Sequence, residues 1–519
     1  MFHGAVLWQQ GEKACEQPVE FDDGLLLFNG DLYMESLRNE KGSDTEFLFE
    51  VLKQAKTEDE ILEVLRSVTG PFSLIYMHKS KIYFARDSLG RNSLILGKEK
   101  DAIFLTSVID PVEEKIEALE LPPLGIFTVD IKSREFSLFP YQNLIHQHHL
   151  EQLDLVKNLI PVNILKNTMP MWHTDPVNLP NFSFDKLCCD LNDENLFENL
   201  LKLPTVAEIS ENFIELLSAS IKDRIENTQS FCKNCFNTQL CNHSNIGILF
   251  SGGVDCSMVA TLADKFIDRS RPIDLINIAF EKVSYSIKKP DDINWNVPDR
   301  LTGIETLKEL KRLCPNRAWN FVEVNVTRAE LNENLPKLSS LVFPLSNVLD
   351  ESLGAALYFA SRGVGRIDDL PYSSPCRVIL IGSGADELFG GYTRHRNAFR
   401  RSNDRDLLKE ELDLDWVRLP SRNLARDDRV IADNGITVRA PFIEEKFVNF
   451  VQHLKPLQRC FPALAEGVGD KLLLRLSAYS IGLQNCSRFK KRALQFGSRI
   501  ADKRQSAKDT SKLLTKNIK

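Results

Sequence analysis

The clearest chemical signal in the sequence is the run at 250–257, Phe-Ser-Gly-Gly-Val-Asp-Cys-Ser, which lies between an apolar run and a helical pattern. Gly252 and Gly253 allow a tight turn and a close approach of the backbone to an anion. A helix that begins there offers unpaired N–H groups and the positive end of its dipole, and both favour phosphate. Asp255 would repel a phosphate unless a cation lies between them, and Mg²⁺ prefers carboxylate and phosphate oxygens. The run therefore predicts a nucleotide site made of Phe250, Ser251, Gly252, Gly253, Asp255, Cys256 and Ser257.

A second loop of small residues, at 382–392, follows a β-branched run at 377–381, and Asp386 and Glu387 lie just past the end of that run. If the two runs are neighbouring strands, Asp255 and Asp386 can hold one Mg²⁺ between them. The cation would neutralise pyrophosphate as it leaves. A plain turn is the alternative for the Gly-Gly pair near the end of the loop. The residues that this loop adds to the predicted nucleotide site are Ile381, Gly382 and Gly384.

The elements around both loops alternate between strand and helix patterns. Amphipathic spacing predicts helices at 208–225 and 259–266. Continuous apolar or β-branched runs predict strands at 247–250, 273–280, 320–326 and 377–381. This alternation is typical of a parallel sheet with helices on both faces, whose ligands bind outside the carboxyl ends of the strands. We therefore predict an α/β domain over 205–519, with a solvated basic tail at its end.

Residues 1–135 have a different pattern. Short strands are predicted at 24–30, 72–77 and 81–86, and a helical pattern separates the first from the other two, which indicates an α+β domain. The stretch 136–204 is rich in Asn, Leu, His and Pro without a sustained period, so we predict a linker and insertion there. A solvated loop is the favoured prediction for its clustered histidines, with a metal site as the alternative. These histidines are His146, His148 and His149.

The composition excludes several classes of protein. A chain of 519 residues is too long for one hydrophobic core, so two or three domains are expected. The net charge of -7 gives no sign of a nucleic-acid-binding surface. No apolar run approaches the roughly 20 residues that span a bilayer. No basic stretch followed by an apolar one marks the first residues, so no secretion signal is expected and we predict a cytoplasmic location. The 11 cysteines are then expected to be reduced thiols.

One group of cysteines has the spacing of a metal site. Cys232, Cys235, Cys241 and His243 form a C-x2-C-x5-C-x-H pattern, which resembles zinc-ligand spacing in its first half. The second half is unusually tight, and the segment is polar and loop-like. Plain solvent-exposed thiols are therefore the favoured prediction, and zinc is the alternative.

Together these motifs resemble the synthetase domain of glutamine-hydrolysing asparagine synthetases. The resemblance rests on the runs 251–257 and 382–392, on Arg426-Asp-Asp-Arg429 and on Arg439-Ala-Pro-Phe-Ile-Glu444, in the order in which the family has them. It implies an ATP-pyrophosphatase (PP-loop) fold, with ATP and Mg²⁺ as cofactors. The catalytic candidates that it implies are Asp386, Glu387, Lys471, Lys490 and Lys491.

Several of these positions depart from the family pattern. Ser383 stands where the family has a glutamate that is linked to the chemical step and to the choice of substrate. Cys256 replaces a phosphate-loop serine, which weakens one side-chain donor and leaves the backbone amides in place. A family lysine aligns with Ala493, and either Lys490 or Lys491 could supply its charge from a nearby position.

The N-terminal part resembles the glutaminase domain of the same enzymes, which belongs to the N-terminal-nucleophile class. Asn29-Gly30-Asp31 matches an oxyanion-hole pair followed by an acidic residue, and Ser43-Asp-Thr-Glu46 matches a substrate-binding segment. Family members open with Met-Cys-Gly, whereas this sequence opens with Met-Phe-His. Without a terminal thiolate and its amine base, glutamine hydrolysis is not expected. The residues predicted as a remnant of the glutamine site are Asn29, Gly30, Asp31 and Asp44.

The resemblance implies an ATP-dependent amide ligase. A carboxylate, most simply that of aspartate, would attack the α-phosphorus of ATP, and ammonia would then attack the adenylate. Phe250, Ala279 and Phe280 would line the adenine pocket. A non-catalytic ATP-binding protein and an adenylating ligase for another acid stay open as alternatives, because a fold does not determine a substrate. The expected partners are small molecules, namely ATP, a carboxylic acid and ammonia or glutamine, and neither nucleic acid nor a membrane.

Overall fold

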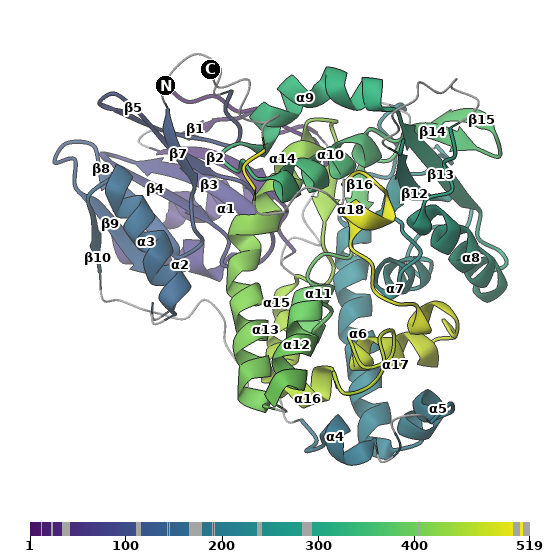
Figure 1. The fold of residues 1–519 in the computed structure, drawn as a ribbon. Helices are drawn as coiled ribbons and strands as arrows, with labels where there is room; N and C mark the ends of the chain where they lie inside the picture. Colours follow the sequence, from purple (N-terminus) through teal and green to yellow (C-terminus); the bar gives the residue numbers. More distant parts are fainter. Residues whose placement is uncertain are drawn as a thin grey trace.

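The computed structural model of the protein describes residues 1–11, 13–21, 24–33, 42–110, 116–142, 144, 146–165, 179–188, 190, 193–235, 241–282, 293–402, 404–501 and 509–511. These residues form two units, each built on a seven-stranded sheet (Figure 1). No helix within these ranges is both long and apolar enough to cross a membrane. The predicted basic tail falls outside the described residues, apart from 509–511.

The N-terminal unit has one large sheet and one small sheet. In spatial order, the large sheet contains β1 (Val19–Phe21), β2 (Gly24–Gly30), β3 (Phe72–His78), β4 (Lys81–Arg86), β8 (Gly125–Asp130), β9 (Phe136–Pro140) and β10 (Val162–Ile164). Its neighbouring strands are antiparallel, except for the parallel pair β9 and β10. The small sheet has the order β6 (Ala102–Thr106), β5 (Ile95–Glu99) and β7 (Glu117–Glu120). The three strands predicted in this region are therefore confirmed as β2, β3 and β4.

Helices cover this large sheet from both sides. One core lies between the sheet, α1 (Asp44–Gln54) and α2 (Glu58–Ser67). A second core lies between the sheet, the small sheet and α3 (Gln147–Leu159). Tyr83 and Ala85 of β4 enter the first core and Phe84 enters the second, as the alternation of side chains along a strand requires. Capping boxes at Ser43 and Thr57 determine where α1 and α2 begin.

The prediction of a linker at 136–204 is wrong for most of the residues that the structure describes in this range. β9 begins at residue 136, and α3 and β10 extend the same unit to residue 164. His146 is the N-cap of α3, and the other two clustered histidines lie in that helix and not in a loop. Further along, α4 (Phe184–Leu187) and α5 (Leu196–Leu201) pack into the core of the C-terminal unit. Their short, irregularly spaced apolar residues gave no helical period.

The C-terminal unit is an α/β sheet flanked by helices. Its sheet has the order β15 (Leu370–Ser373), β14 (Val364–Ile367), β13 (Trp319–Val326), β12 (Ile273–Phe280), β11 (Ile246–Leu249), β16 (Val378–Leu380) and β17 (Thr437–Arg439). The five strands from β13 to β17 in this order are parallel, and β14 and β15 add an antiparallel hairpin at one edge. This confirms the predicted parallel-sheet domain after an α+β domain.

Two cores cover the two faces of this sheet. Leu380 of β16 enters a core with α6 (Pro204–Glu226), α7 (Val254–Ala263), α15 (Glu445–His453) and α17 (Leu472–Ser480). Ile379, its neighbour on the same strand, enters a core with α9 (Arg328–Val342), α10 (Val348–Arg362) and α14 (Ala425–Ala432). Figure 1 shows these two groups of helices on opposite sides of the strands. The remaining helices are α8 (Pro298–Leu313), α11 (Ala385–Phe389), α12 (Thr393–Ser402), α13 (Arg405–Leu419), the π-helical turn Pro420–Leu424, α16 (Pro456–Arg459), the 3-10 turn Cys486–Arg488 and α18 (Leu494–Gly497).

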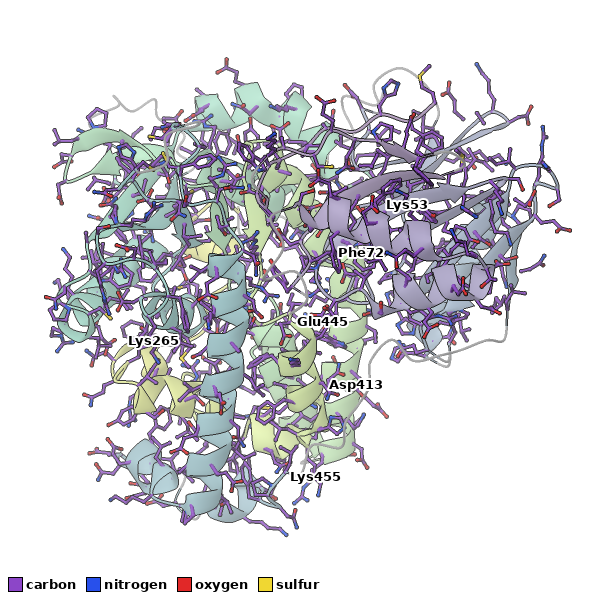
Figure 2. All side chains as sticks on the ribbon, turned by 180° about the vertical axis from the view of Figure 1, so that it is seen from behind. Lys53, Phe72, Lys265, Asp413, Glu445 and Lys455 are labelled. Atoms are coloured by element: carbon purple, nitrogen blue, oxygen red, sulfur yellow. The ribbon has the colours of Figure 1, made fainter. Side chains whose placement is uncertain are left out.

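Buried ion pairs join the two units. Their members are Asp31 and Arg439, Glu120 and Arg429, and Arg91 and Glu445. Glu445 also accepts a hydrogen bond of 2.9 Å from the backbone N–H of Gly70, which lies just before β3. Figure 2 shows this junction from behind, with Phe72 and Glu445 labelled on its two sides. Because the charges are buried in pairs, the relative position of the two units depends on them.

Candidate functional site

The first predicted loop turns tightly between β11 and α7. Gly252 has a φ of +78°, and a Cβ there would lie 2.5 Å from the carbonyl oxygen of Thr302 in α8, so only glycine fits. Gly253 is the N-cap of α7, and no side chain caps this helix end. The N–H groups of the first turn are therefore available to an anion. This geometry suits phosphate, as the loop sequence predicts.

The hydroxyl and thiol groups of this loop are partly engaged. The Ser257 hydroxyl donates to the carbonyl oxygen of Gly253 at 2.7 Å, and the buried Cys256 thiol donates to the same oxygen at 3.2 Å. Both groups therefore tighten the first turn of α7. Ser251 is only partly buried, and its hydroxyl is the one that the loop can present to a ligand.

The second loop meets the first at the carboxyl ends of adjacent strands. β11 and β16 are parallel neighbours in the sheet. Gly384 has a φ of +94°, and a Cβ on Gly382 would lie 3.0 Å from the Cβ of Asp255. The glycines therefore allow the two loops to pack directly against each other.

Lys471 joins the two predicted metal-binding carboxylates. Its Nζ lies 2.7 Å from Oδ2 of Asp255 and 2.6 Å from Oδ1 of Asp386, and its side chain is almost fully buried. Lys471 itself has a φ of +56° at the start of α17. A Cβ on Gly391 would lie 1.9 Å from Oδ1 of Asp386 and 2.3 Å from Cε of Lys471, so glycine is required there. The structure thus brings together three residues that are far apart in the sequence.

Burial and charge set the protonation of this group. Burial acts to raise the pKa of Asp386, but the charges of Lys471 and Lys491 outweigh it and hold that pKa well below its usual value. Burial raises the pKa of Asp255, with Asp386 adding to the rise and Lys471 opposing it. Burial acts to lower the pKa of Lys471, but the two carboxylates raise it above its usual range. The group therefore combines a firmly charged cation with a firmly charged Asp386 at neutral pH.

One carboxylate oxygen of this group is suited to a metal ion. Oδ1 of Asp255 is buried and has no hydrogen-bond partner among the described residues. A buried acceptor without a donor is costly, and a divalent cation is one way to satisfy it. Carboxylate oxygens with nearby phosphate oxygens are the ligands that Mg²⁺ prefers. The residues present therefore fit the predicted ion.

The environments of Lys490 and Lys491, the two lysines that the sequence left as alternatives, differ in the structure. Nζ of Lys491 lies 3.4 Å from Oδ2 of Asp386 and 4.5 Å from the ring centre of Tyr392. Lys490 is exposed to solvent. Ala493, which aligns with the family lysine, is the N-cap of α18. The position of Lys491 thus lets it supply the charge that Ala493 lacks.

Glu387 lies beside the carboxylate pair. It accepts a 2.6 Å hydrogen bond from the hydroxyl of Tyr392. Burial, with Asp386 adding to it, raises the pKa of Glu387 to about 7. Ser383 is only partly buried in the turn before α11. A hydroxyl at residue 383 brings no negative charge to this already acidic site, whereas the family glutamate would.

The predicted adenine-pocket side chains lie in the cores. The ring of Phe250 packs edge-on against Phe321, and the ring of Phe280 packs edge-on against Phe359. Ile381 is buried as well. Ala279, next to Phe280 in β12, is buried too. The contact of these residues with adenine stays a prediction, and it would have to involve mainly their backbone.

Two residues beside the site were not predicted from the sequence. Asp299 lies near the start of α8, and its Oδ2 is buried without a hydrogen-bond partner among the described residues. Burial raises the pKa of Asp299 to about 7, although Arg492 and Lys491 act to lower it. Tyr392, the partner of Glu387, ends the second loop. A buried Asp or Tyr carries no periodic signal, so only their proximity to the loops could have suggested them.

The predicted remnant of the glutamine site lies at the junction of the two units. Asn29, Gly30, Asp31 and Asp44 line one hollow there, together with residues 436–438 of the C-terminal unit. Arg439 binds Asp31 through two hydrogen bonds of 2.8 and 2.7 Å. Gln10 and Tyr33 also donate to the Asp31 carboxylate, at 2.9 and 3.1 Å. Both oxygens of Asp31 are therefore already occupied.

Comparison with known proteins finds one family match in each of the two units. A family model described as asparagine synthase matches residues 231–409, and one described as glutamine amidotransferase domain matches residues 10–114. An asparagine synthetase domain-containing protein of Drosophila melanogaster is 43% identical over 530 residues, which cover 98% of this chain and 91% of that protein. Asparagine synthetase domain-containing protein 1 of Homo sapiens is 33% identical over 570 residues, which cover 96% of this chain and 88% of that protein.

Proposed function

Because the chain belongs to the asparagine synthetase domain-containing protein family, we propose that it is an AMP-forming amide ligase that converts aspartate to asparagine with ATP. The observation that carries the proposal is the meeting of Asp255, Asp386 and Lys471 beside an uncapped helix N-terminus. This arrangement has the parts that a pyrophosphate-releasing site needs. Backbone donors at the start of α7 can bind phosphates, carboxylates can hold a cation, and a buried lysine can stabilise developing charge.

The proposed reaction has two steps. A carboxylate oxygen of aspartate attacks the α-phosphorus of ATP. The bond between the α-phosphorus and the oxygen that bridges it to the β-phosphate breaks, and pyrophosphate leaves. Ammonia then attacks the carbonyl carbon of the adenylate and loses a proton, and AMP leaves as the amide forms. Mg²⁺, when bound, would offset the charge of the leaving pyrophosphate.

The residues of the chain have distinct roles in this proposal. The N–H groups at the start of α7 bind phosphate oxygens. Asp255 and Asp386 would hold Mg²⁺, and Oδ1 of Asp255 is the oxygen that has no partner among the described residues. Lys471 and Lys491 stabilise negative charge on the phosphates as the α–β bond breaks. Glu387, whose pKa is raised to about 7 by burial, is suited to take up the proton that ammonia releases.

Free ammonia is the proposed nitrogen donor. Recognition of glutamine would require an acidic group that can receive its ammonium. The remnant has two acidic residues, Asp44, which accepts hydrogen bonds from the backbone N–H groups of Thr45 and Leu32, and Asp31. The two oxygens of Asp31 already accept hydrogen bonds from Arg439, Gln10 and Tyr33. A competing ligand would have to break a buried ion pair, which is costly.

The test is pyrophosphate release by the full chain from ATP and Mg²⁺. Aspartate and ammonia together should give release, with one AMP and one asparagine for each pyrophosphate. Glutamine in place of ammonia should give little asparagine. ATP binding without turnover on any carboxylic acid would instead support a non-catalytic ATP-binding protein. Release with a different acid would keep the chemistry and overturn the substrate.

The two adjacent lysines provide a matched pair of variants. Lys491→Ala should lower pyrophosphate release about tenfold, because it removes a charge beside Asp386 that can stabilise the leaving phosphates. Lys490→Ala removes an exposed lysine next to it, so the rate should stay within about twofold of wild type. Initial rates measured at saturating ATP would compare the two variants. Equal losses in both would remove Lys491 from the proposed site.

A further inference from the structure

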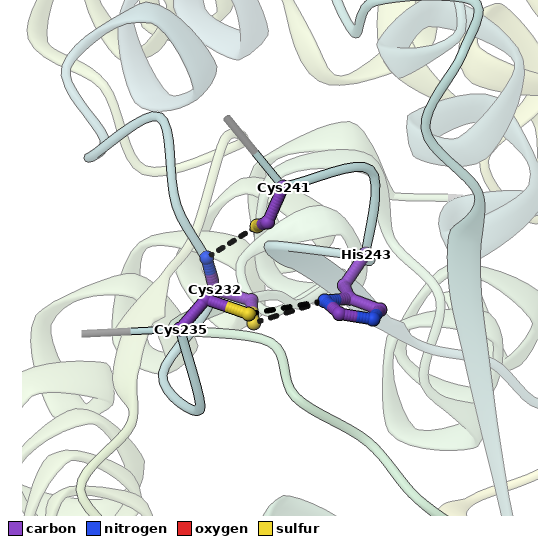
Figure 3. Close-up of side chains that lie close together, drawn as sticks. All are labelled: Cys232, Cys235, Cys241 and His243. Atoms are coloured by element: carbon purple, nitrogen blue, oxygen red, sulfur yellow. Dashed lines mark hydrogen bonds between the residues drawn. The ribbon is translucent and has the colours of Figure 1, made fainter. Parts of the chain in front are cut away.

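A second cluster of potential metal ligands lies near the opposite ends of the strands from the phosphate loops. It follows α6 and leads into β11, at the amino end of that strand. The ligand atoms of Cys232, Cys235, Cys241 and His243 all lie within 4.8 Å of one another. Figure 3 shows the sulfurs of Cys232 and Cys235 beside the imidazole of His243, and the sulfur of Cys241 next to the backbone nitrogen of Cys232.

The distances within the cluster suit one tetrahedral metal ion. Nδ1 of His243 lies 3.3 Å from Sγ of Cys235 and 3.7 Å from Sγ of Cys232. With metal bonds of about 2.3 Å to sulfur and about 2.0 Å to nitrogen, a tetrahedral zinc site places nitrogen and sulfur ligands about 3.5 Å apart. The two observed separations lie on either side of that value. Small shifts of the side chains would therefore complete the coordination shell.

The surroundings of the sulfurs also suit bound thiolates. Cys232 and Cys241 are buried, and Sγ of Cys241 accepts a hydrogen bond of 3.2 Å from the backbone N–H of Cys232. Hydrogen bonds from N–H groups to sulfur are a usual feature around metal-bound thiolates.

We propose that Cys232, Cys235, Cys241 and His243 bind one zinc ion. Three thiolates and one imidazole in a tetrahedron are a donor set that zinc prefers. Because the protein supplies all four ligands, the site leaves no position for a substrate and has a structural role. The burial of two of the cysteines argues against the exposed thiols that the sequence favours.

The position of the cluster indicates what the metal would stabilise. Phe231, beside Cys232, packs edge-on against Trp8 and lies under the guanidinium of Arg377. The backbone N–H of Lys233 donates to the carbonyl oxygen of Pro375, just before β16. Zinc would therefore hold together the segment before β11, the segment before β16 and the N-terminal residues around Trp8. These contacts involve the strands that carry both phosphate loops, but the site does not depend on the proposed ligase activity.

The first experiment measures metal in the full chain after purification without chelators. Wild type should contain about one zinc per chain. His243→Ala should lose it, and because His243 is exposed this variant should still fold. His243→Cys should keep it, since four cysteines also bind zinc. Cys15→Ser changes a cysteine outside the cluster and should leave the zinc content unchanged.

A second measurement reports the ligands directly. The chain is stripped of metal under reducing conditions and titrated with Co²⁺ as the probe. Wild type, His243→Cys and Cys15→Ser should show thiolate-to-cobalt charge transfer and the intense d–d absorption of tetrahedral Co²⁺, and His243→Ala should not. The metal-free chain should also have a lower Tm, which added Zn²⁺ restores.

Three outcomes would overturn the proposal. The first is that purified wild type contains no zinc and that its spectrum with Co²⁺ shows no thiolate-to-cobalt charge transfer. The second is an equal zinc content in wild type and His243→Ala. The third is a mass and thiol count showing that cysteines of the cluster form a disulfide in the folded chain.

Discussion

Asp255→Asn should lower aspartate-dependent pyrophosphate release by roughly 10²–10³-fold, the loss typical of removing one group that stabilises developing charge. The change keeps the shape of the side chain but removes one of the two carboxylates that meet at Lys471. It also turns Oδ1, the buried oxygen that has no partner among the described residues, from a charged carboxylate oxygen into a neutral amide oxygen, which is a weaker ligand for Mg²⁺. Lys471 keeps Asp386 as its counterion, so the variant should fold. The loss should therefore appear in catalysis and in the response to Mg²⁺.

Two measurements separate a metal role from a structural one. ATP binding without Mg²⁺ should be nearly unchanged in Asp255→Asn, whereas the gain in affinity on adding Mg²⁺ should shrink. Asp268→Asn is the matched control, because Asp268 is an exposed carboxylate shortly after the same helix and should leave the rate within about twofold of wild type. A variant of Asp255 that keeps the wild-type rate and the wild-type response to Mg²⁺ would remove this residue from the proposed metal site.

The central strands of the C-terminal sheet could be predicted from sequence because they are buried on both faces. The run predicted at 273–280 is β12 (Ile273–Phe280), and every residue of it is buried. A strand covered on both faces needs an apolar residue at almost every position, and this pattern is visible without a partner. Some glycines of the two loops are also determined locally, because Gly252 and Gly384 have a positive φ that other residues rarely adopt.

The rest of the site depends on contacts between distant segments. Nothing in the sequence around Lys471 shows that it lies between Asp255 and Asp386, because the sequence alone does not distinguish a buried lysine from an exposed one. Lys490 and Lys491 were indistinguishable for the same reason. Neighbouring residues of an extended segment point in opposite directions, and only the path of the chain before α18 determines which lysine reaches Asp386.

The metal-ligand spacing at 232–243 is the opposite case, because its residues can be recognised in the sequence but their arrangement cannot. Its residues were visible, but the tight second half of the pattern argued against zinc. In the structure, Cys241 and His243 lie close to Cys232 and Cys235, and the three cysteines pack in one small core with Phe231 and Trp8. Spacing rules describe common ways to bring ligands together, and tertiary contacts can do so with a less common spacing.

Asp31→Asn should destabilise the chain by about 3–5 kcal/mol, the usual cost of removing one partner of a buried ion pair. The side chains of Asp31 and Arg439 are 3% and 0% exposed, and two hydrogen bonds join them across the two units. The variant leaves the Arg439 guanidinium buried without its counterion. Urea unfolding followed by tryptophan fluorescence and by far-UV circular dichroism measures the loss, with both probes needed because two units need not unfold in one step.

Asp101→Asn is the matched control for this prediction, since Asp101 is exposed in the N-terminal unit and its loss should cost less than about 0.5 kcal/mol. The double variant Asp31→Asn with Arg439→Gln should cost less than the sum of the two single variants, because it leaves no buried charge without a partner. Additive losses, or a loss below about 1 kcal/mol in Asp31→Asn, would mean that the pair does not hold the units together.

The pH dependence of stability tests independently whether the ion pair between Asp31 and Arg439 stabilises the folded state. Burial acts to raise the pKa of Asp31, but Arg439 outweighs it and lowers that pKa below its usual value. A carboxyl whose folded-state pKa is lowered stabilises the folded state fully above its unfolded pKa of about 4, and this contribution is lost as the pH falls through the folded-state pKa. The advantage of wild type over Asp31→Asn should therefore be full at neutral pH and shrink in acid. A difference that instead grew as the pH fell would contradict the ion pair, because protonation of Asp31 can only weaken its attraction for Arg439.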